Sequence, residues 1–283
     1  MTGPVLDFII IGAMKCGTTT LQAQLAAQPG IFMTTPKEPN FFSDDAVYAQ
    51  GQGWYRSLFY DAAPGDLKGE ASTHYTKLPT YPQTVARMSQ VLMAPRLIYV
   101  IRNPVTRAVS HYIHEWSEGR MSQDAIAAFA SDATLQAYSH YPMQLAPFID
   151  AFGLDAIHLT SLELMKADPD GEMAKISTHL QVSTPLVWDN DMGAQNVSAQ
   201  RVRRLPLQRL IVDNPVATFL RHNLVPKAVR NRIREGRTIT ARPELPQELR
   251  RQLEDVFTPD RAALEALFPG HPALPLCYGF TDR

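Results

Sequence analysis

The chain has 283 residues, of which 45% are hydrophobic and 19% are charged, and its formal net charge is -1. This length and composition are those of a globular protein with a substantial core, and the near-neutral charge argues against a nucleic-acid partner. Two cysteines are too few for a metal cluster or a disulfide framework, so neither is expected.

The first predicted element is a strand in the apolar run FIIIGA (8–13), which suits a strand buried on both faces of a sheet. The segment TTTLQAQLAAQ (18–28) predicts a helix that the following Pro29-Gly30 pair ends. A strand, a glycine-containing loop and a helix in this order are the opening of an α/β nucleotide-binding unit.

The loop between this strand and helix has the spacing of a nucleotide P-loop but not its lysine. Gly12 and Gly17 keep the G-x-x-x-x-G spacing, yet Thr18 stands where the motif has lysine, and the only nearby lysine is Lys15, inside the loop. Backbone N–H groups between Gly12 and Thr20, together with the positive end of the helix dipole, would form an anion-binding concavity. Lys15 would add a full charge, and the threonines after Gly17 would add hydroxyl donors.

Apolar runs and turn residues predict the remaining elements. They are a two-proline loop over 36–43, a strand ending within 69–76, a buried strand over 96–104 that Pro104 breaks, a helix over 105–119, a strand and a short helix over 155–169, and two amphipathic helices over 243–268 joined near Pro259. The alternation predicts an α/β protein with a P-loop-containing nucleotide-binding-like fold, in which helices flank both faces of a central parallel sheet. We expect one domain over 1–283, with a mainly helical, basic part over 200–283.

The residue at the end of the strand over 96–104 bears on the kind of ligand. In a nucleoside triphosphatase or P-loop kinase, an acidic residue at the end of a neighbouring strand helps to hold Mg²⁺. Here the strand ends in Arg102, which would repel a metal ion and attract a second phosphate. Arg107 and Ser110 follow on the predicted helix, where a hydroxyl could reach the same phosphate. The pattern indicates two anionic groups and no metal.

Four segments in this order resemble the sulfotransferases that use 3′-phosphoadenosine 5′-phosphosulfate (PAPS). GAMKCGTTTL (12–21) is similar to their 5′-phosphosulfate loop, and IRNPVTRAVSHY (101–112) to their 3′-phosphate segment. PKEPNFF (36–42) and GEASTHYT (69–76) are similar to the K-E-x-x-F-F and G-E-x-S-x-x-Y stretches of the heparan sulfate N- and 3-O-sulfotransferase branch and its bacterial relatives. The resemblance implies PAPS as donor, adenosine 3′,5′-bisphosphate (PAP) as product, and transfer without a metal.

The resemblance also implies roles for single residues. The residues expected to hold the 5′-phosphosulfate are Lys15, Cys16, Gly17, Thr18, Thr19 and Thr20, and those expected to hold the 3′-phosphate are Arg102 and Ser110. Lys15 would also stabilise the charge that grows on the bridging oxygen as the sulfuryl group leaves. The loop that closes over the donor in relatives is matched to NVSAQRVRR (196–204), with Asn196, Ser198 and Arg201 as donor-binding residues.

The general base is expected to be Glu70, which the resemblance matches to the glutamate base of the heparan sulfate branch. His74 is the alternative, because the cytosolic branch uses a histidine and His74 lies four residues further on. Lys37 and Glu38 are expected to line the acceptor cleft. The other functions considered are a P-loop kinase or triphosphatase and a non-catalytic nucleotide-binding module.

The acceptor is not indicated by any motif, so carbohydrate, lipid and small-molecule hydroxyls or amines all stay open. From Arg201 to Arg237 there are ten lysines and arginines against two acidic residues, and the stretch 207–237 mixes these with apolar residues. Such a segment could contact an anionic membrane or cover the acceptor. A signal peptide is not predicted at the N-terminus, and a cytoplasmic location is expected.

Overall fold

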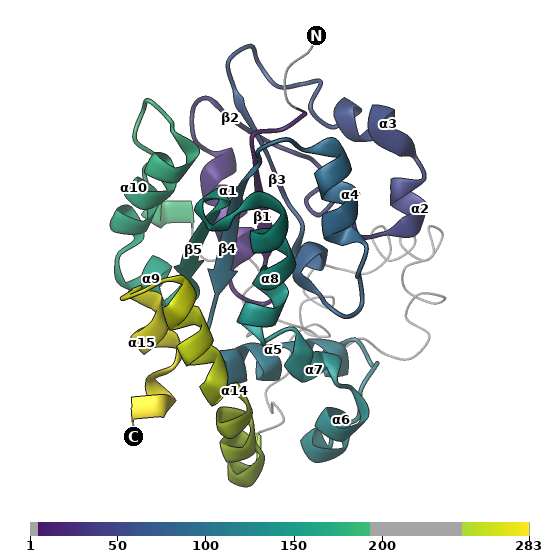
Figure 1. The fold of residues 1–283 in the computed structure, drawn as a ribbon, viewed down its shortest axis with the longest axis vertical. Coiled ribbons are helices and arrows are strands. Elements are labelled where there is room, and N and C mark those ends of the chain that lie inside the picture. The colour runs from purple at the N-terminus through teal and green to yellow at the C-terminus, as the bar shows by residue number, and fades with distance from the viewer. Residues whose placement is uncertain (1–4, 193–244, 283) are drawn as a thin grey trace, which may run out of the picture.

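The computed structural model describes residues 5–192 and 245–282. Its centre is a parallel sheet of five strands in the order β2-β3-β1-β4-β5 (Figure 1). The strands are β1 (Phe8–Gly12), β2 (Ile31–Met33), β3 (Leu67–Ala71), β4 (Arg96–Ile101) and β5 (Ile157–Ser161). The α/β fold predicted from the sequence is therefore confirmed, and β2 is a strand that the sequence patterns did not reveal.

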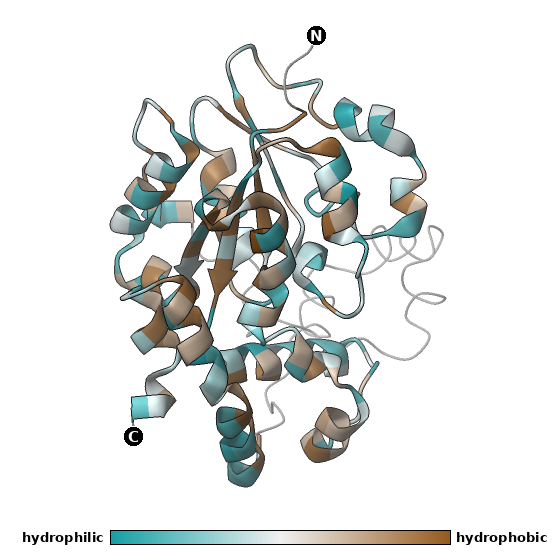
Figure 2. Ribbon diagram, viewed as in Figure 1, coloured by the Kyte–Doolittle hydropathy of each residue, from teal (hydrophilic) through white to brown (hydrophobic). Residues whose placement is uncertain are grey.

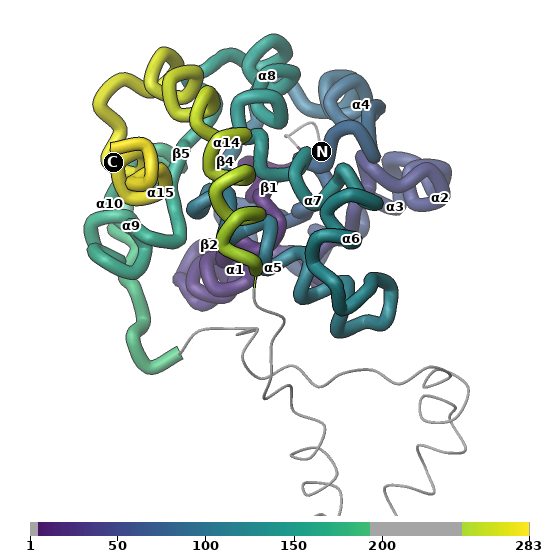
Figure 3. The backbone as a smooth tube through the Cα atoms, turned by 90° about the horizontal axis from the view of Figure 1, so that it is seen from below, coloured from purple at the N-terminus to yellow at the C-terminus, as the bar shows by residue number. Residues whose placement is uncertain are grey.

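Helices cover both faces of the sheet. They are α1 (Thr18–Ala26), α2 (Asp45–Tyr48), α3 (Gly51–Ser57), α4 (Thr84–Val91), α5 (Pro104–Ser117), α6 (Ala125–Ser131), α7 (Thr134–Ala137), α8 (Tyr141–Phe152), α9 (Leu162–Ala167), α10 (Pro169–Leu180), α14 (Gln247–Leu267) and α15 (Ala273–Cys277), with short 3₁₀ turns η1 (Thr73–Thr76), η2 (Leu154–Ala156), η3 (Asn190–Met192) and η5 (Gly279–Asp282). Figures 1 and 3 place α1 on one face of the sheet and α4 with α8 on the other.

The centre of the core is formed by β1 and β4, whose residues are mainly apolar on both sides. All five residues of β1 are buried, and β4 is buried from Leu97 onward. Figure 2 shows these strands as the hydrophobic centre, with hydrophilic residues spread over the surrounding helices. A parallel sheet covered on both faces requires such continuous apolar runs, which is why the sequence revealed β1 and β4 clearly.

Two strand–helix junctions at the carboxyl edge of the sheet are fixed by helix caps. Asn103 accepts a hydrogen bond from the Thr106 N–H (2.9 Å) at the start of α5, and Pro104 occupies the first turn. Ser161 caps α9 in the same way through the Leu164 N–H (3.0 Å). The caps orient α5 and α9 so that the residues just after β4 and β5 face this edge.

The expectation of two helices over 243–268 is wrong, because α14 runs without interruption through Pro259. Proline removes the backbone donor that would reach the Asp255 carbonyl, but this one lost hydrogen bond does not end the helix. Leu253, Phe257 and Leu264 are all buried, so both halves of the helix contribute to one apolar face. Packing of this face against α5 and α8 outweighs the local effect of the proline.

Membrane contact was considered from the sequence both for the helices and for the basic segment near the C-terminus. Within the described ranges, the helices are all too short or too polar to span a bilayer. The basic segment over 201–237, which could contact a membrane or cover the acceptor, lies outside the described residues, and so do Asn196, Ser198 and Arg201.

Candidate functional site

The phosphate-loop motif lies at the carboxyl end of β1, where two glycines are required by the backbone. Gly17 precedes α1 with φ of 91°, and a Cβ there would meet Leu162 at 2.8 Å. Gly12 has φ of 152°, and its missing Cβ leaves room for the hydroxyl of Thr76, which donates to the Ile11 carbonyl (2.9 Å). Both positions exclude other residues, so the loop keeps its backbone close to whatever binds above it.

The side chains of this loop divide between the surface and the core. Lys15, Thr19 and Thr20 are partly exposed at the start of α1, whereas Thr18 is 4% exposed. Lys15 itself has a left-handed backbone (φ 71°), which is uncommon outside glycine and is typical of functional loops. These residues can present one ammonium and several donors to a bound anion.

Cys16 does not share this orientation, although the sequence placed it among the donor-binding residues. Its side chain is fully buried, and its sulfur lies 3.7 Å from the hydroxyl of Tyr141. Burial raises the pKa of the Cys16 thiol to about 12. The thiol therefore packs beneath the loop as a neutral group and is not available to a ligand.

The second element expected to bind an anion follows β4 and lies against the phosphate loop. Arg102 is half-buried, and its Nη1 donates to the Lys15 carbonyl at 3.4 Å. The Tyr141 hydroxyl receives the Arg102 N–H (3.3 Å) and donates to the Arg102 carbonyl (2.8 Å), which fixes the backbone there. Ser110 lies two turns into α5 and is 8% exposed. The structure thus brings together Lys15 and Arg102, as the sequence predicted.

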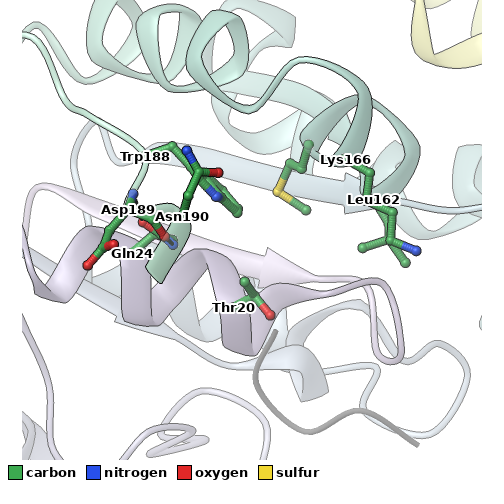
Figure 4. Close-up of a pocket in the computed structure, with 8 residues that line it drawn as sticks. Thr20, Gln24, Leu162, Lys166, Trp188, Asp189 and Asn190 are labelled. Atoms are coloured by element: carbon green, nitrogen blue, oxygen red, sulfur yellow. Dashed lines mark hydrogen bonds between the residues drawn. The ribbon is translucent and has the colours of Figure 1, made fainter. Parts of the chain in front are cut away.

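A pocket of 170 Å³ lies beside the phosphate loop, between α1 and α9 (Figure 4). Its lining residues are Thr20 and Gln24 of α1, Leu162, Met165 and Lys166 of α9, and Trp188, Asp189 and Asn190. A pocket of this size has room for a planar heterocycle. An indole, a thioether and aliphatic groups form a largely apolar wall for such a ring.

Two glutamines, Gln24 in α1 and Gln28 just after its end, hold the outer wall of this pocket. Gln24 exchanges two hydrogen bonds with the backbone of Asp189, each 2.8 Å long. Gln28 does the same with Val187, at 2.8 and 3.0 Å. Trp188 lies between these two anchored residues. Trp188 could not be identified from the sequence, because a lone tryptophan outside any motif gives no signal until the fold places it beside the loop.

Glu70, expected to be the base, is completely buried on β3. The hydroxyl of Tyr55 donates to its Oε2 at 2.6 Å, and Tyr55 is stacked on Phe41 with 4.4 Å between ring centroids. Burial raises the pKa of Glu70 to about 7, although the nearby hydroxyls of Tyr55, Tyr75 and Ser72 oppose the rise. A base must reach the proton that it removes, so this enclosed carboxyl does not fit the expected role.

The accessible carboxylate is that of Glu38, whose side chain is 31% exposed. Glu38 has a left-handed backbone (φ 61°), and its N–H donates to the Ala71 carbonyl at the end of β3 (3.0 Å). Its Oε1 accepts from Lys37 Nζ (2.8 Å) and from the Thr73 hydroxyl (3.2 Å). Burial opposes ionisation, but Lys37 and then Lys77 hold the pKa of Glu38 below its ordinary value. Glu38 is thus an ionised carboxylate at the carboxyl edge of the sheet.

His74, the alternative base, is a weaker candidate than Glu38. Its ring stacks on Tyr81 with 4.8 Å between centroids. Burial and the neighbouring charge of Lys77 lower the pKa of His74 to about 4. The imidazole is therefore neutral at pH 7, but its ring is stacked and its Nδ1 is buried, so it is less accessible to an acceptor than the Glu38 carboxylate.

The comparison with protein families places residues 6–265 of this chain on the model described as "Sulfotransferase domain". Among curated proteins, the chain is 32% identical over 188 residues to heparan sulfate glucosamine 3-O-sulfotransferase 3B1 of Mus musculus, covering 61% of this chain and 45% of that protein. It is 31% identical over 180 residues to heparan sulfate glucosamine 3-O-sulfotransferase 6 of Homo sapiens, covering 61% and 51%. The matched part thus spans about half the length of these relatives.

Solved structures resemble the fold. A sulfotransferase from Alicyclobacillus acidocaldarius matches with a TM-score of 0.66 and 23% identity, over 96% of this chain and 98% of that one. A mouse sulfotransferase, SULT7A1, solved in complex with PAP, matches with a TM-score of 0.52 and 14% identity, over 98% of this chain and 90% of that one. At these identities the likeness concerns the fold alone.

Proposed function

Because this chain belongs to the sulfotransferase family, we propose that it transfers the sulfuryl group of PAPS directly to a hydroxyl or amine of an acceptor. The bond between sulfur and the bridging oxygen of the donor breaks as the bond from sulfur to the acceptor oxygen or nitrogen forms. The bonding electrons stay with PAP, and the acceptor proton passes to a base. No covalent enzyme intermediate is needed. The observation that carries the proposal is the contact between Arg102 and the phosphate loop, which places two anion-binding elements side by side.

The donor fits along this edge of the sheet in three parts. The 5′-phosphosulfate would lie on the loop, held by Lys15, Thr19 and Thr20 and by the backbone N–H groups at the start of α1. The 3′-phosphate would lie between Arg102 and Ser110. The adenine would enter the pocket beside α1 and stack on the indole of Trp188. Asn196, Ser198 and Arg201 remain proposed donor ligands on the strength of the sequence alone.

We assign the base to Glu38 and not to Glu70. Glu38 lies at the strand edge with an accessible, ionised carboxylate, whereas Glu70 is enclosed by Tyr55 and its aromatic neighbours. The hydrogen bonds from Lys37 and Thr73 orient the Glu38 carboxylate. In this assignment Glu70 is a structural residue that anchors α3 to the sheet, and Lys37 positions the base.

Arg102→Ala should remove the preference for a 3′-phosphate. A buried charge-assisted bond to phosphate contributes about 1.5–3 kcal/mol, so PAP affinity should fall roughly 10- to 150-fold. Affinity for adenosine 5′-phosphosulfate, which lacks the 3′-phosphate, should change much less. Calorimetric titration of both ligands measures this. An equal loss for both would show that Arg102 does not bind the 3′-phosphate.

The direct test of the proposed function is to measure which ligand raises the melting temperature of the protein. At a hundred times its dissociation constant, PAP should stabilise the folded chain by about 2.7 kcal/mol, which is measured as a rise in melting temperature. The rise should persist in EDTA, because Arg102 stands where a metal-binding acid would be and we propose transfer without a metal. ATP with Mg²⁺ should have little effect. The opposite result, stabilisation by ATP with Mg²⁺ alone, would favour a P-loop kinase or triphosphatase.

The acceptor remains the open part of the proposal. The two named relatives are enzymes of heparan sulfate glucosamine, and a carbohydrate hydroxyl is accordingly the first acceptor to test. Lipid and small-molecule acceptors, the contact of the basic segment 201–237 with a membrane, and the cytoplasmic location stay predictions from the sequence.

A further inference from the structure

Lys77 lies at the boundary between the donor loop and the acceptor side. It is the residue directly after η1, and this 3₁₀ turn contacts both sides. At its start the hydroxyl of Thr73 donates to Glu38 Oε1 (3.2 Å), and at its end the hydroxyl of Thr76 donates to the Ile11 carbonyl (2.9 Å) beneath the phosphate loop. A side chain leaving from Lys77 therefore starts within the region where donor and acceptor meet.

The ammonium of Lys77 belongs to a buried cluster assembled around the ring of Tyr138. The ring centroid of Tyr138 is 5.9 Å from Lys77 Nζ and 5.8 Å from Arg107 Cζ, and the ring stacks on His111 at 5.4 Å. We call Lys77, Arg107, His111 and Tyr138 the inner cationic cluster. Lys77 is 8% exposed, Arg107 is fully buried, and His111 is 5% exposed. Burial, Arg107 and Lys77 together lower the pKa of His111 to about 2, so His111 is neutral and the charges of the cluster are those of Lys77 and Arg107.

The acidic groups nearest to Lys77 are already bound to other cations. Glu38 accepts from Lys37 Nζ at 2.8 Å, and Glu115 accepts from Arg120 Nη2 at 3.0 Å. Both acids act on Lys77 only through space. Among the described residues, no carboxylate forms an ion pair with Lys77. Keeping an ammonium in a mostly buried position without an anion is costly, and a ligand that supplies the missing charge gives a physical reason for keeping it there.

We propose that Lys77 is a catalytic residue whose ammonium binds a non-bridging oxygen of the sulfuryl group during transfer. The inference rests on the proposed function, since PAPS delivers this group. Lys77 lies on the acceptor side of the transferring sulfur, opposite Lys15 on the donor side. It keeps its proton throughout: the donor oxygen–sulfur bond breaks, the acceptor–sulfur bond forms, and the acceptor proton goes to Glu38. Its contribution is to stabilise negative charge on the equatorial oxygens, in a site with little water.

The test compares Lys77→Met with Lys77→Arg and with the control Lys68→Met. Lys68 lies near the amino end of β3, so its replacement removes one lysine charge away from the site. At saturating PAPS and acceptor, Lys77→Met should lower turnover by at least about tenfold and by up to the ~10²-fold loss of a charge-stabilising donor. Lys77→Arg should recover part of the loss. The affinity for PAP, which has no sulfuryl group, should stay within about twofold because no described bond joins Lys77 to the donor loop.

Two thermal measurements separate this role from a structural one. Without ligand, Lys77→Met should melt at the same or a higher temperature than the original chain, since an unpaired buried charge has been removed. With PAP bound, inorganic sulfate should raise the melting temperature of the original chain and of Lys68→Met but not of Lys77→Met. The sulfate measurement needs no turnover, so it stays informative if the chain sulfates none of the acceptors tried, an outcome that would count against the proposed function alone.

Three results would overturn the inference. The first is normal turnover of Lys77→Met at saturation, and the second is a clear drop in its melting temperature without ligand, which would make Lys77 a structural residue. The third is a loss confined to the Michaelis constant of acceptors that carry a carboxylate or sulfate. That pattern would move the anion partner of Lys77 from the sulfuryl group to the acceptor.

Discussion

Glu38→Gln should lower turnover by about 10²–10⁴-fold, the range for loss of a positioned general base. Glutamine keeps the size of the side chain and can still accept the hydrogen bonds of Lys37 and Thr73 through its amide oxygen. It cannot take up the acceptor proton. PAP affinity and the melting temperature should change little, because Glu38 contacts neither the phosphate loop nor Arg102 in this structure.

The matched control is Glu70→Gln, which changes the same atoms on the carboxylate that the sequence had favoured. Its amide oxygen can accept the hydrogen bond from Tyr55, so we expect a folded protein with turnover close to normal. Steady-state kinetics of the two variants decide the assignment. If Glu70→Gln loses turnover while remaining folded and Glu38→Gln does not, the base is Glu70, and the aromatic residues over it must move during the reaction.

The pH dependence gives an independent measure of the same choice. A base works only when deprotonated, and the pKa of Glu38 lies below its ordinary value. With Glu38 as base, turnover should therefore be independent of this group's ionisation from about pH 6 upward. The pKa of Glu70 is about 7, so with Glu70 as base turnover would rise with pH through the neutral range.

Lys15→Ala should lower turnover at saturating PAPS by about 10²–10³-fold, the usual effect of removing one group that stabilises developing charge. The charge on the bridging oxygen is largest in the transition state, so the effect belongs mainly to turnover and less to binding. PAP affinity should fall by a smaller factor, because the backbone N–H groups of the loop and Arg102 remain. Single-turnover kinetics and calorimetry with PAP separate the two quantities.

Lys15→Arg serves as the control for charge, because it retains the cation on a longer and planar group. We expect PAP affinity to be largely restored and turnover only in part, since a planar group reaches the bridging oxygen at a different place. Collapse of PAP affinity in Lys15→Ala with unchanged turnover at saturation would make Lys15 a binding residue only.

The sequence predicted those parts of the site that depend on neighbours in the chain. Gly12, Lys15 and Gly17 lie at or just after the end of one strand, and Arg102 comes directly after another. Parallel strands have their carboxyl ends at the same edge of the sheet, so the sequence predicts that these residues lie at one edge. Glu70 shows the limit of this reasoning. The sequence correctly placed Glu70 at the end of β3. The environment of its carboxyl, however, depends on Tyr55 and Phe41, which belong to other segments of the chain.

Other features could not be predicted because they depend on contacts between distant segments. Trp188 lines the pocket only because Gln24 and Gln28 hold its neighbours, more than 150 residues away along the chain. Within the described part of the chain, the ammonium of Lys77 lacks an ion pair because the acidic residues near it are bound to other cations. No sequence pattern reveals this arrangement. Pro259 predicted a helix break, and that local signal was overridden by an apolar face buried along the whole of α14.

The bonds from Gln24 and Gln28 have a consequence for how the donor is held. The helix that starts at the phosphate loop also carries Gln24 in its second turn, and Gln28 follows just beyond its end at Ala26; both anchor the Trp188 wall. The surfaces proposed for the phosphosulfate and for the adenine are thus joined to each other through α1 and these hydrogen bonds. Ordering two separate surfaces would cost conformational entropy when the donor binds. Here much of that entropy has already been lost during folding. The proposed donor site would thus be preorganised before PAPS binds, so that more of the binding free energy holds PAPS in place.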